Sequence, residues 1–335
     1  MSKNRNGGRR KKFFLNLVVL CCVAGMSCTA MAASQDKYDL PEPYLTWEKG
    51  FIREFPPLQG LMDTMIGTTV MQLKAPEADI LHNRVCSALA YEMAKTLPKD
   101  ERKLAVATDL LHNISKEDKG AVLTNPEVFR STAEMVSKLK KAGYFKASPG
   151  FWTDEALLKN PKIGANLGLI HHITGALTAG DIAEKAGGFS GKEIEAIRVA
   201  VLEHSTGYWY FRSSVDDAAG RKDAWRIVYP EPENEIARIA HDADLISQFV
   251  PESVVPEGSK WRVLAKNRWK AKDTREEAHI VHYVFFRLFE EAKTVKGKAL
   301  AKEKWEQIRP ELLRLMGLKP DQDPVKVLGV PKIFQ

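Results

Sequence analysis

The sequence predicts an all-α protein. Apolar residues recur at spacings of three and four through most of the chain, as expected for helices that bury one face. Segments in which β-branched and polar residues alternate, as they do in half-buried strands, are scarce. The 335 residues, of which 44% are hydrophobic and 28% charged, have the composition of a globular protein that can bury a sizeable core.

The helical pattern can be followed from one element to the next. It marks residues 80–93, 104–111, 127–142, 161–177, 194–202, 236–245, 274–292 and 298–316. Proline should open one of these helices at Pro161 and break or kink the last one at Pro310. Residues 143–161 and 206–232 lack the pattern and are expected to be loops, and the proline-rich tail after Gly317 is expected to run extended.

The first 32 residues have the order of segments found in a secretory signal peptide. Basic residues without an acidic one are followed by an apolar run from Phe13 to about Ala24, and then by the small-residue sequence Ala30-Met31-Ala32. We expect cleavage after Ala32 and a secreted or periplasmic protein that has no membrane contact after cleavage. A retained membrane anchor is the alternative.

The predicted signal peptide also accounts for the charge and the cysteine content. Six positive charges lie in residues 1–32, so most of the net charge of +7 belongs to them and the remainder is nearly neutral. A nucleic-acid polymer is therefore not expected as a partner. Cys86 is the only cysteine after residue 32, which excludes an internal disulfide there and favours a small buried side chain.

Histidines at apolar helical positions are the main candidates for chemistry. Four of them follow apolar pairs on predicted helices, and an acidic residue lies in a similar run: His82, His112, His171, His204 and Asp244. Burying several imidazoles is costly unless each has a polar partner. Since imidazole and carboxylate are suitable metal donors, one ion can be the partner of several side chains at once. The pattern therefore predicts a metal site shared by several helices.

The residues around His112 carry a family resemblance. Residues 110–116 (LLHNISK) resemble the signature of the HD superfamily of metal-dependent phosphohydrolases. His82 is similar to the first histidine of that family, and Asp244 to its closing aspartate. The segment that begins at His171 is similar to a third-histidine element, and the one at His204 to the fourth-histidine element of bacterial diadenosine tetraphosphate hydrolases and, less closely, of HD-GYP cyclic dinucleotide phosphodiesterases.

The resemblance covers about residues 75–250 and implies a domain organisation. Residues 75–250 would form an HD-type metal-binding helical bundle. Residues 33–74 would be an N-terminal extension after the signal peptide, and residues 251–335 would add C-terminal helices packed on the bundle.

The chain departs from the family at Asn113, where the family has an aspartate that commonly bridges two metals. A neutral amide bridges poorly, and Asp244 alone offers little negative charge for two divalent ions. The resemblance thus implies one tightly held transition metal, either Fe, Mn, Ni or Zn, bound through His82, His112 and Asp244 with Asn113 beside it. A second, weaker site could use His171 and His204.

The activity implied by the resemblance is hydrolysis of a small, nucleotide-like phosphoester by a metal-activated water. Lys116 could contact the developing negative charge as a catalytic residue, or be a solvated lysine. Arg84 and Arg212 could bind substrate phosphate, or form an ion pair and pack an aromatic loop. Because of Asn113, a degenerate HD protein that binds a ligand or serves as a scaffold is the alternative function, and a di-iron HD oxygenase is a third. The sequence does not indicate the oligomeric state.

Overall fold

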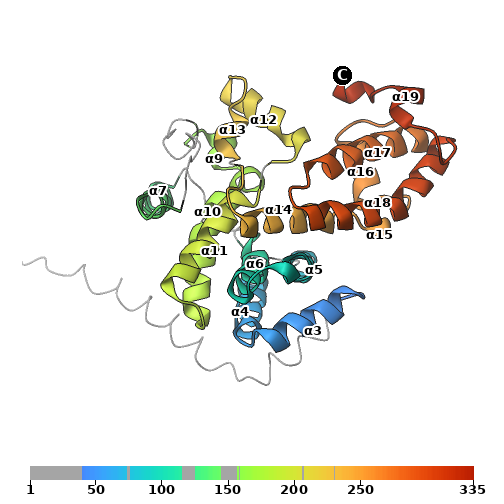
Figure 1. Cartoon of the computed structure of the whole chain (residues 1–335). Helices are drawn as coiled ribbons and strands as arrows, with labels where there is room; N and C mark the ends of the chain where they lie inside the picture. Colours follow the sequence, from blue (N-terminus) through green and yellow to red (C-terminus); the bar gives the residue numbers. More distant parts are fainter. Residues whose placement is uncertain are drawn as a thin grey trace, which may run out of the picture. The chain divides into compact units, whose positions relative to one another are not determined.

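The protein is helical throughout the part of the chain that the structure describes. The computed structural model describes residues 40–335 apart from 74–75, 115–124, 145–156, 158, 206 and 230. These described residues form helices and their connections but no strand (Figure 1). The all-α prediction is therefore confirmed.

A bundle of helices forms the middle of the molecule and holds the candidate site. Its members are α5 (Glu77–Met93), α6 (Lys99–Leu111), α10 (Leu167–Ala186), α11 (Gly191–Glu203) and α14 (Glu235–Ser247). Helix α14 packs on both α5 and α6, and α11 packs on α6, α10 and α14 (Figure 1). The starts of α11 and α14 are fixed by side-chain caps: Ser190 forms a capping box with Glu193, and the Asn234 side chain accepts a hydrogen bond from the Ala237 amide.

Two further helices precede the bundle and pack against it. Helix α3 (Tyr44–Glu54) packs on α5, and α4 (Pro57–Gln72) packs on α6 and α10. The Arg84 guanidinium on α5 is buried and forms an ion pair with Glu48 of α3, with Nε 2.7 Å from Oε2. The segment expected as an N-terminal extension thus contributes ordered helices to the same body.

The C-terminal helices pack beside α14. They are α15 (Pro251–Val254), α16 (Lys260–Asn267), α17 (Thr274–Glu291) and α18 (Val295–Met316). Their aromatic side chains, Phe285 and Trp305 among them, form one apolar cluster with Phe249 just after α14. Asp242 of α14 is fully buried and accepts hydrogen bonds from the Lys293 amide, the Thr294 amide and the Thr294 hydroxyl at 2.7, 2.7 and 2.8 Å. One buried carboxylate thereby fixes the start of α18 to α14.

Most predicted helices are found where the pattern places them, and α7 (Pro126–Lys141) matches the prediction for 127–142 almost residue for residue. Pro161 opens only the short α9 (Pro161–Gly164), because a break over residues 165–166 separates it from α10. Of the break or kink predicted at Pro310, the break was wrong, since α18 continues through that residue. Buried Ile308, Leu312 and Leu313 on either side hold the helix in the core despite the missing amide.

Two segments expected to lack helices contain short ones. Residues 206–232 include α12 (Trp209–Ala219) and α13 (Trp225–Val228), which bury Tyr210, Val215 and Val228. The tail after Gly317 contains α19 (Pro324–Leu328) and the 3-10 turn η4 (Lys332–Phe334), whose Phe334 ring contacts Trp209 and Trp269. Aromatic packing, rather than a three- and four-residue apolar repeat, orders both segments.

Some predictions fall on residues outside those described. These are the signal peptide, most of the expected loop at 143–161, and Lys116. Among the helices that are described, none is both long and apolar enough to cross a bilayer.

Candidate metal centre

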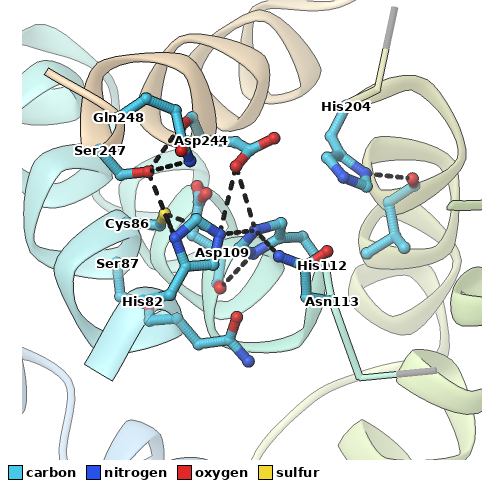
Figure 2. A network of polar contacts seen from close by, with 12 residues as sticks. His82, Cys86, Ser87, Asp109, His112, Asn113, His204, Asp244, Ser247 and Gln248 are labelled. Carbon is cyan, nitrogen blue, oxygen red and sulfur yellow. Dashed lines mark hydrogen bonds and ion pairs between the residues drawn. The ribbon is translucent and has the colours of Figure 1, made fainter. Parts of the chain in front are cut away.

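Side chains from α5, α6 and α14 converge on one point in the bundle (Figure 2). His82 comes from the first half of α5, His112 is the C-cap residue of α6, and Asp244 lies near the end of α14. The His82 Nε2 atom is 3.2 Å from Asp244 Oδ1 and 3.2 Å from His112 Nε2, and His112 Nε2 is 3.9 Å from Asp244 Oδ1. The three donors predicted from sequence therefore lie together.

The spacing of these atoms suits a shared metal ion. An ion about 2.1 Å from each nitrogen or oxygen donor separates neighbouring donors by about 3.0 Å at octahedral angles and about 3.4 Å at tetrahedral angles. Two of the three observed separations fall between these values, and the third needs only a small side-chain shift. His82, Cys86, His112 and Asp244 form a group that could hold a metal ion.

Hydrogen bonds elsewhere on the imidazoles leave lone pairs facing the shared point. The His112 Nδ1 atom lies 2.8 Å from the Asp109 carbonyl oxygen and donates to it, so Nε2 carries the lone pair. Ser247 donates its hydroxyl proton to the Asp244 carbonyl and can therefore accept a hydrogen bond from His82 Nδ1, 3.3 Å away. Both Nε2 atoms then present lone pairs next to a carboxylate oxygen, which is the arrangement that a cation stabilises.

The charges at the site favour an ionised Asp244 and a neutral His112. Burial alone would raise the pKa of Asp244, but its interactions with the imidazoles of His82, His112 and His204 hold that pKa well below its usual range. Burial, together with repulsion from His204 and His82, lowers the pKa of His112 well below its usual range. These are the protonation states that metal ligands need.

The Asp244 carboxylate is also oriented from its other side. The Tyr208 hydroxyl donates to Oδ2 at 3.1 Å, so Oδ1 is the oxygen directed at the two imidazoles. His82 and Asp244 each keep 18% of the side-chain surface exposed, whereas His112 is fully buried. The site is thus open to solvent on the side of His82 and Asp244.

His204 and His171 extend the cluster in the direction of α10. The His204 ring centroid lies 5.0 Å from that of His112, and the His171 centroid lies 5.3 Å from that of His204. His204 is the C-cap residue of α11, and its Nδ1 donates to the Val201 carbonyl at 2.7 Å. His112, the C-cap residue of α6, makes the equivalent bond to the carbonyl three residues before it. A hydrogen bond from the Glu233 amide to the buried Glu203 carboxylate, 3.0 Å long, joins the end of α11 to the start of α14.

Asn113 lies beside His112 with its amide turned toward the site. Its Nδ2 is 2.8 Å from His112 Nε2, and its Oδ1 is buried without a hydrogen-bond partner in the described part of the chain. Rotation of the amide would exchange the two atoms and turn an oxygen toward the shared point. A small pocket adjoins this side of the site and is lined by Asn113, Asn83, Gln72 and Asp79, among others.

Two side chains at the site were missed by the sequence analysis. Cys86, one turn after His82 on α5, places its Sγ 3.8 Å from both ring nitrogens of His82. Asp109, one turn before His112 on α6, is fully buried. The four-residue spacing from His82 to Cys86 and the three-residue spacing from Asp109 to His112 are the sequence signals that could have revealed them.

The other candidate residues have structural partners. Arg84 is bound to Glu48, and Arg212 donates to the Gly207 carbonyl, forms an ion pair with Glu291 and stacks on Trp225. These placements favour structural roles over phosphate binding.

His172, His241, His279 and Asp242 have other hydrogen-bond partners, although the His172 ring also lies 6.4 Å from that of His204. His172 bonds to the Val228 carbonyl, His241 contacts Asp242, and His279 bonds to the Gly329 carbonyl. Asp242 holds the start of α18, so Asp244 is the aspartate of α14 that faces the imidazoles.

Comparisons of the chain with protein-family models, with curated proteins and with solved structures found no match.

Proposed function

We propose that the protein is an exported metal-dependent phosphohydrolase or phosphodiesterase of the HD type. The observation that carries this proposal is the convergence of His82 Nε2, His112 Nε2 and Asp244 Oδ1 within 3.9 Å of one another. A further support is that these donors follow one another along the chain in the order of the HD motif elements that they resemble.

The residues around the site are suited to holding a metal and a reacting water. A metal bound there would lower the pKa of a coordinated water and polarise a phosphoryl oxygen. The Tyr208 hydroxyl and Ser247 fix the orientations of Asp244 and His82, which keeps the donors pointed at the ion. The partly exposed side of His82 and Asp244 admits water and substrate.

The donor set favours a transition metal over calcium or magnesium, because imidazole nitrogen outnumbers oxygen. We expect Fe, Mn, Ni or Zn as one tightly held ion at His82, His112 and Asp244. His204 and His171 follow in line and supply the donors for a second, weaker site. The substrate we propose is a small phosphorylated molecule of nucleotide-like chemistry, hydrolysed in the secreted or periplasmic space.

One observation favours a second candidate, a ligand-binding HD protein without turnover. The Asn113 amide donates to His112 Nε2, the same lone pair that a metal requires, and it brings no negative charge. If that hydrogen bond persists in solution, the site would bind a ligand weakly and hydrolyse nothing.

The test begins with metal analysis of the purified full chain, followed by hydrolysis of bis(p-nitrophenyl) phosphate with added Mn²⁺, Fe²⁺, Ni²⁺ or Zn²⁺. We expect close to one equivalent of metal and measurable hydrolysis. His112→Ala and Asp244→Asn should each lose the bound metal and the hydrolytic activity. His279→Gln is the matched control, because His279 is a half-buried histidine outside the cluster and its change should leave metal content and rate unaltered.

The outcomes separate the candidates. Metal without hydrolysis of any phosphoester favours the binding protein. Absence of metal at saturating concentrations of all four ions refutes the metal centre and the proposed activity together. Asn113→Asp should raise the metal content by supplying a bridging carboxylate, and an unchanged content would argue against a place for Asn113 in the ligand shell.

A further inference from the structure

Asp109 is a buried acidic residue with no evident stabilising partner. It lies on α6, its side chain has no exposed surface, and neither of its carboxyl oxygens has a hydrogen-bond partner among the residues that the structure describes. An unpaired carboxylate in the protein interior is strongly unfavourable, so a group of this kind calls for a cation or a proton. Among the described residues, no Lys or Arg side chain donates a hydrogen bond to the Asp109 carboxyl group.

The position of Asp109 connects it to the candidate metal centre. It precedes His112 by three residues, so both side chains project from the same face of α6. The Asp109 backbone carbonyl accepts the hydrogen bond that orients the His112 ring, and Figure 2 shows Asp109 among the side chains of the cluster. Helix α14, which carries Asp244, packs on α6, so the carboxyl groups of Asp109 and Asp244 come from adjoining helices.

Charge balance shows what Asp109 can contribute. A divalent ion held by His82, His112 and Asp244, with Cys86 as a neutral thiol, would leave one uncompensated positive charge in a largely buried site. With Asp109 ionised, two carboxylates and two neutral imidazoles would neutralise the ion. Asn113, which stands where the HD motif has an acidic residue, cannot supply that second charge.

We propose that Asp109 provides the second carboxylate of the metal centre and so compensates for the neutral Asn113. This inference rests on the proposed function, since it takes a divalent transition metal as the ligand of the site. It places the Asp109 carboxylate, from α6, beside the group of His82, Cys86, His112 and Asp244, whose own carboxylate comes from α14.

The test is a titration of the metal-free full chain with Mn²⁺ and Zn²⁺. Calorimetry measures the affinity, and thermal unfolding measures the metal-induced rise in Tm. Asp109→Asn keeps the size of the side chain and removes its charge. We expect at least about tenfold weaker binding and a smaller rise in Tm for this variant. Thr108→Val is the matched control, because Thr108 is the adjacent, equally buried residue on α6, and its isosteric change should leave metal affinity as in the unaltered chain.

A charge exchange sharpens the test. The double variant Asp109→Asn with Asn113→Asp moves the carboxylate to the motif position and should recover the affinity that Asp109→Asn loses. Failure of this recovery would overturn the charge-compensation role. If circular dichroism shows that Asp109→Asn does not fold, Asp109→Ser takes its place in the same titration with the same expected loss.

The possible failures are distinguishable. Equal affinity of Asp109→Asn and the unaltered chain overturns the role of Asp109 and leaves the metal centre of His82, His112 and Asp244 intact. Absence of binding by the unaltered chain overturns both the inference and the proposed function.

Discussion

His282 should make the stability of the protein fall in mild acid. This histidine lies on α17, and both of its ring nitrogens are buried without a hydrogen-bond partner in the described residues. Its ring packs against Trp305, with 5.0 Å between the centroids. Burial, aided by the positive charges of Arg309 and His279, lowers the pKa of His282 from 6.5 to about 4, while Asp323 opposes the shift.

The sign and the size of the effect follow from proton linkage. Below the pKa of the unfolded chain, near 6.5, the unfolded state binds a proton that the folded state does not bind until the pH falls to about 4. The free energy of unfolding therefore decreases as the pH falls through this window. For these two pKa values the loss between pH 7 and pH 5 is about 2 kcal/mol.

The variant His282→Phe isolates this contribution, because a phenyl ring occupies a similar space and binds no proton. Urea unfolding of the unaltered chain and of the variant at pH 7 and pH 5 gives four free energies. The advantage of the variant should be about 2 kcal/mol larger at pH 5 than at pH 7. A chelator in all samples removes any contribution from metal release. Parallel losses of stability in the two proteins would refute the reasoning.

Two further changes test how the site is supported. Asp242→Ala should lower the free energy of unfolding by about 3 kcal/mol or more in urea unfolding, because it leaves the partly buried Lys293 amide and the buried Thr294 amide and hydroxyl without their acceptor; a loss under about 1 kcal/mol would contradict that role. Gly207→Ala should cost roughly 2–4 kcal/mol, since Gly207 has φ +62° and an added Cβ would lie 2.2 Å from the Tyr229 ring. Thermal unfolding by circular dichroism checks this, and an unchanged Tm would show that Tyr229 can move aside.

The fold class and the centre of the candidate site could be predicted from sequence because both rest on strong local patterns. His82, His112 and Asp244 each lie within an apolar helical run, and a buried polar side chain in such a run requires a partner. The same pattern predicted their helices to within a few residues at several boundaries.

The missed features depend on packing between distant segments. Helix α12 was expected to be a loop, because Tyr210 and Phe211 follow no helical repeat and are ordered by contact with Trp261, Trp269 and Arg268. The spacing of Asp109 from His112 was a weak signal, since an acidic residue in a helix is ordinarily a solvated one. The packing of neighbouring helices on α6 makes it a fully buried group.

The donors of the cluster lie thirty or more positions apart, at residues 82, 112 and 244, and no two of them adjoin in an extended polypeptide. An ion bound there would act as a reversible crosslink between α5 and α6, early in the chain, and α14, late in the chain. The complete donor set exists only once α14 has packed against α5 and α6, so the ion would enter late in folding.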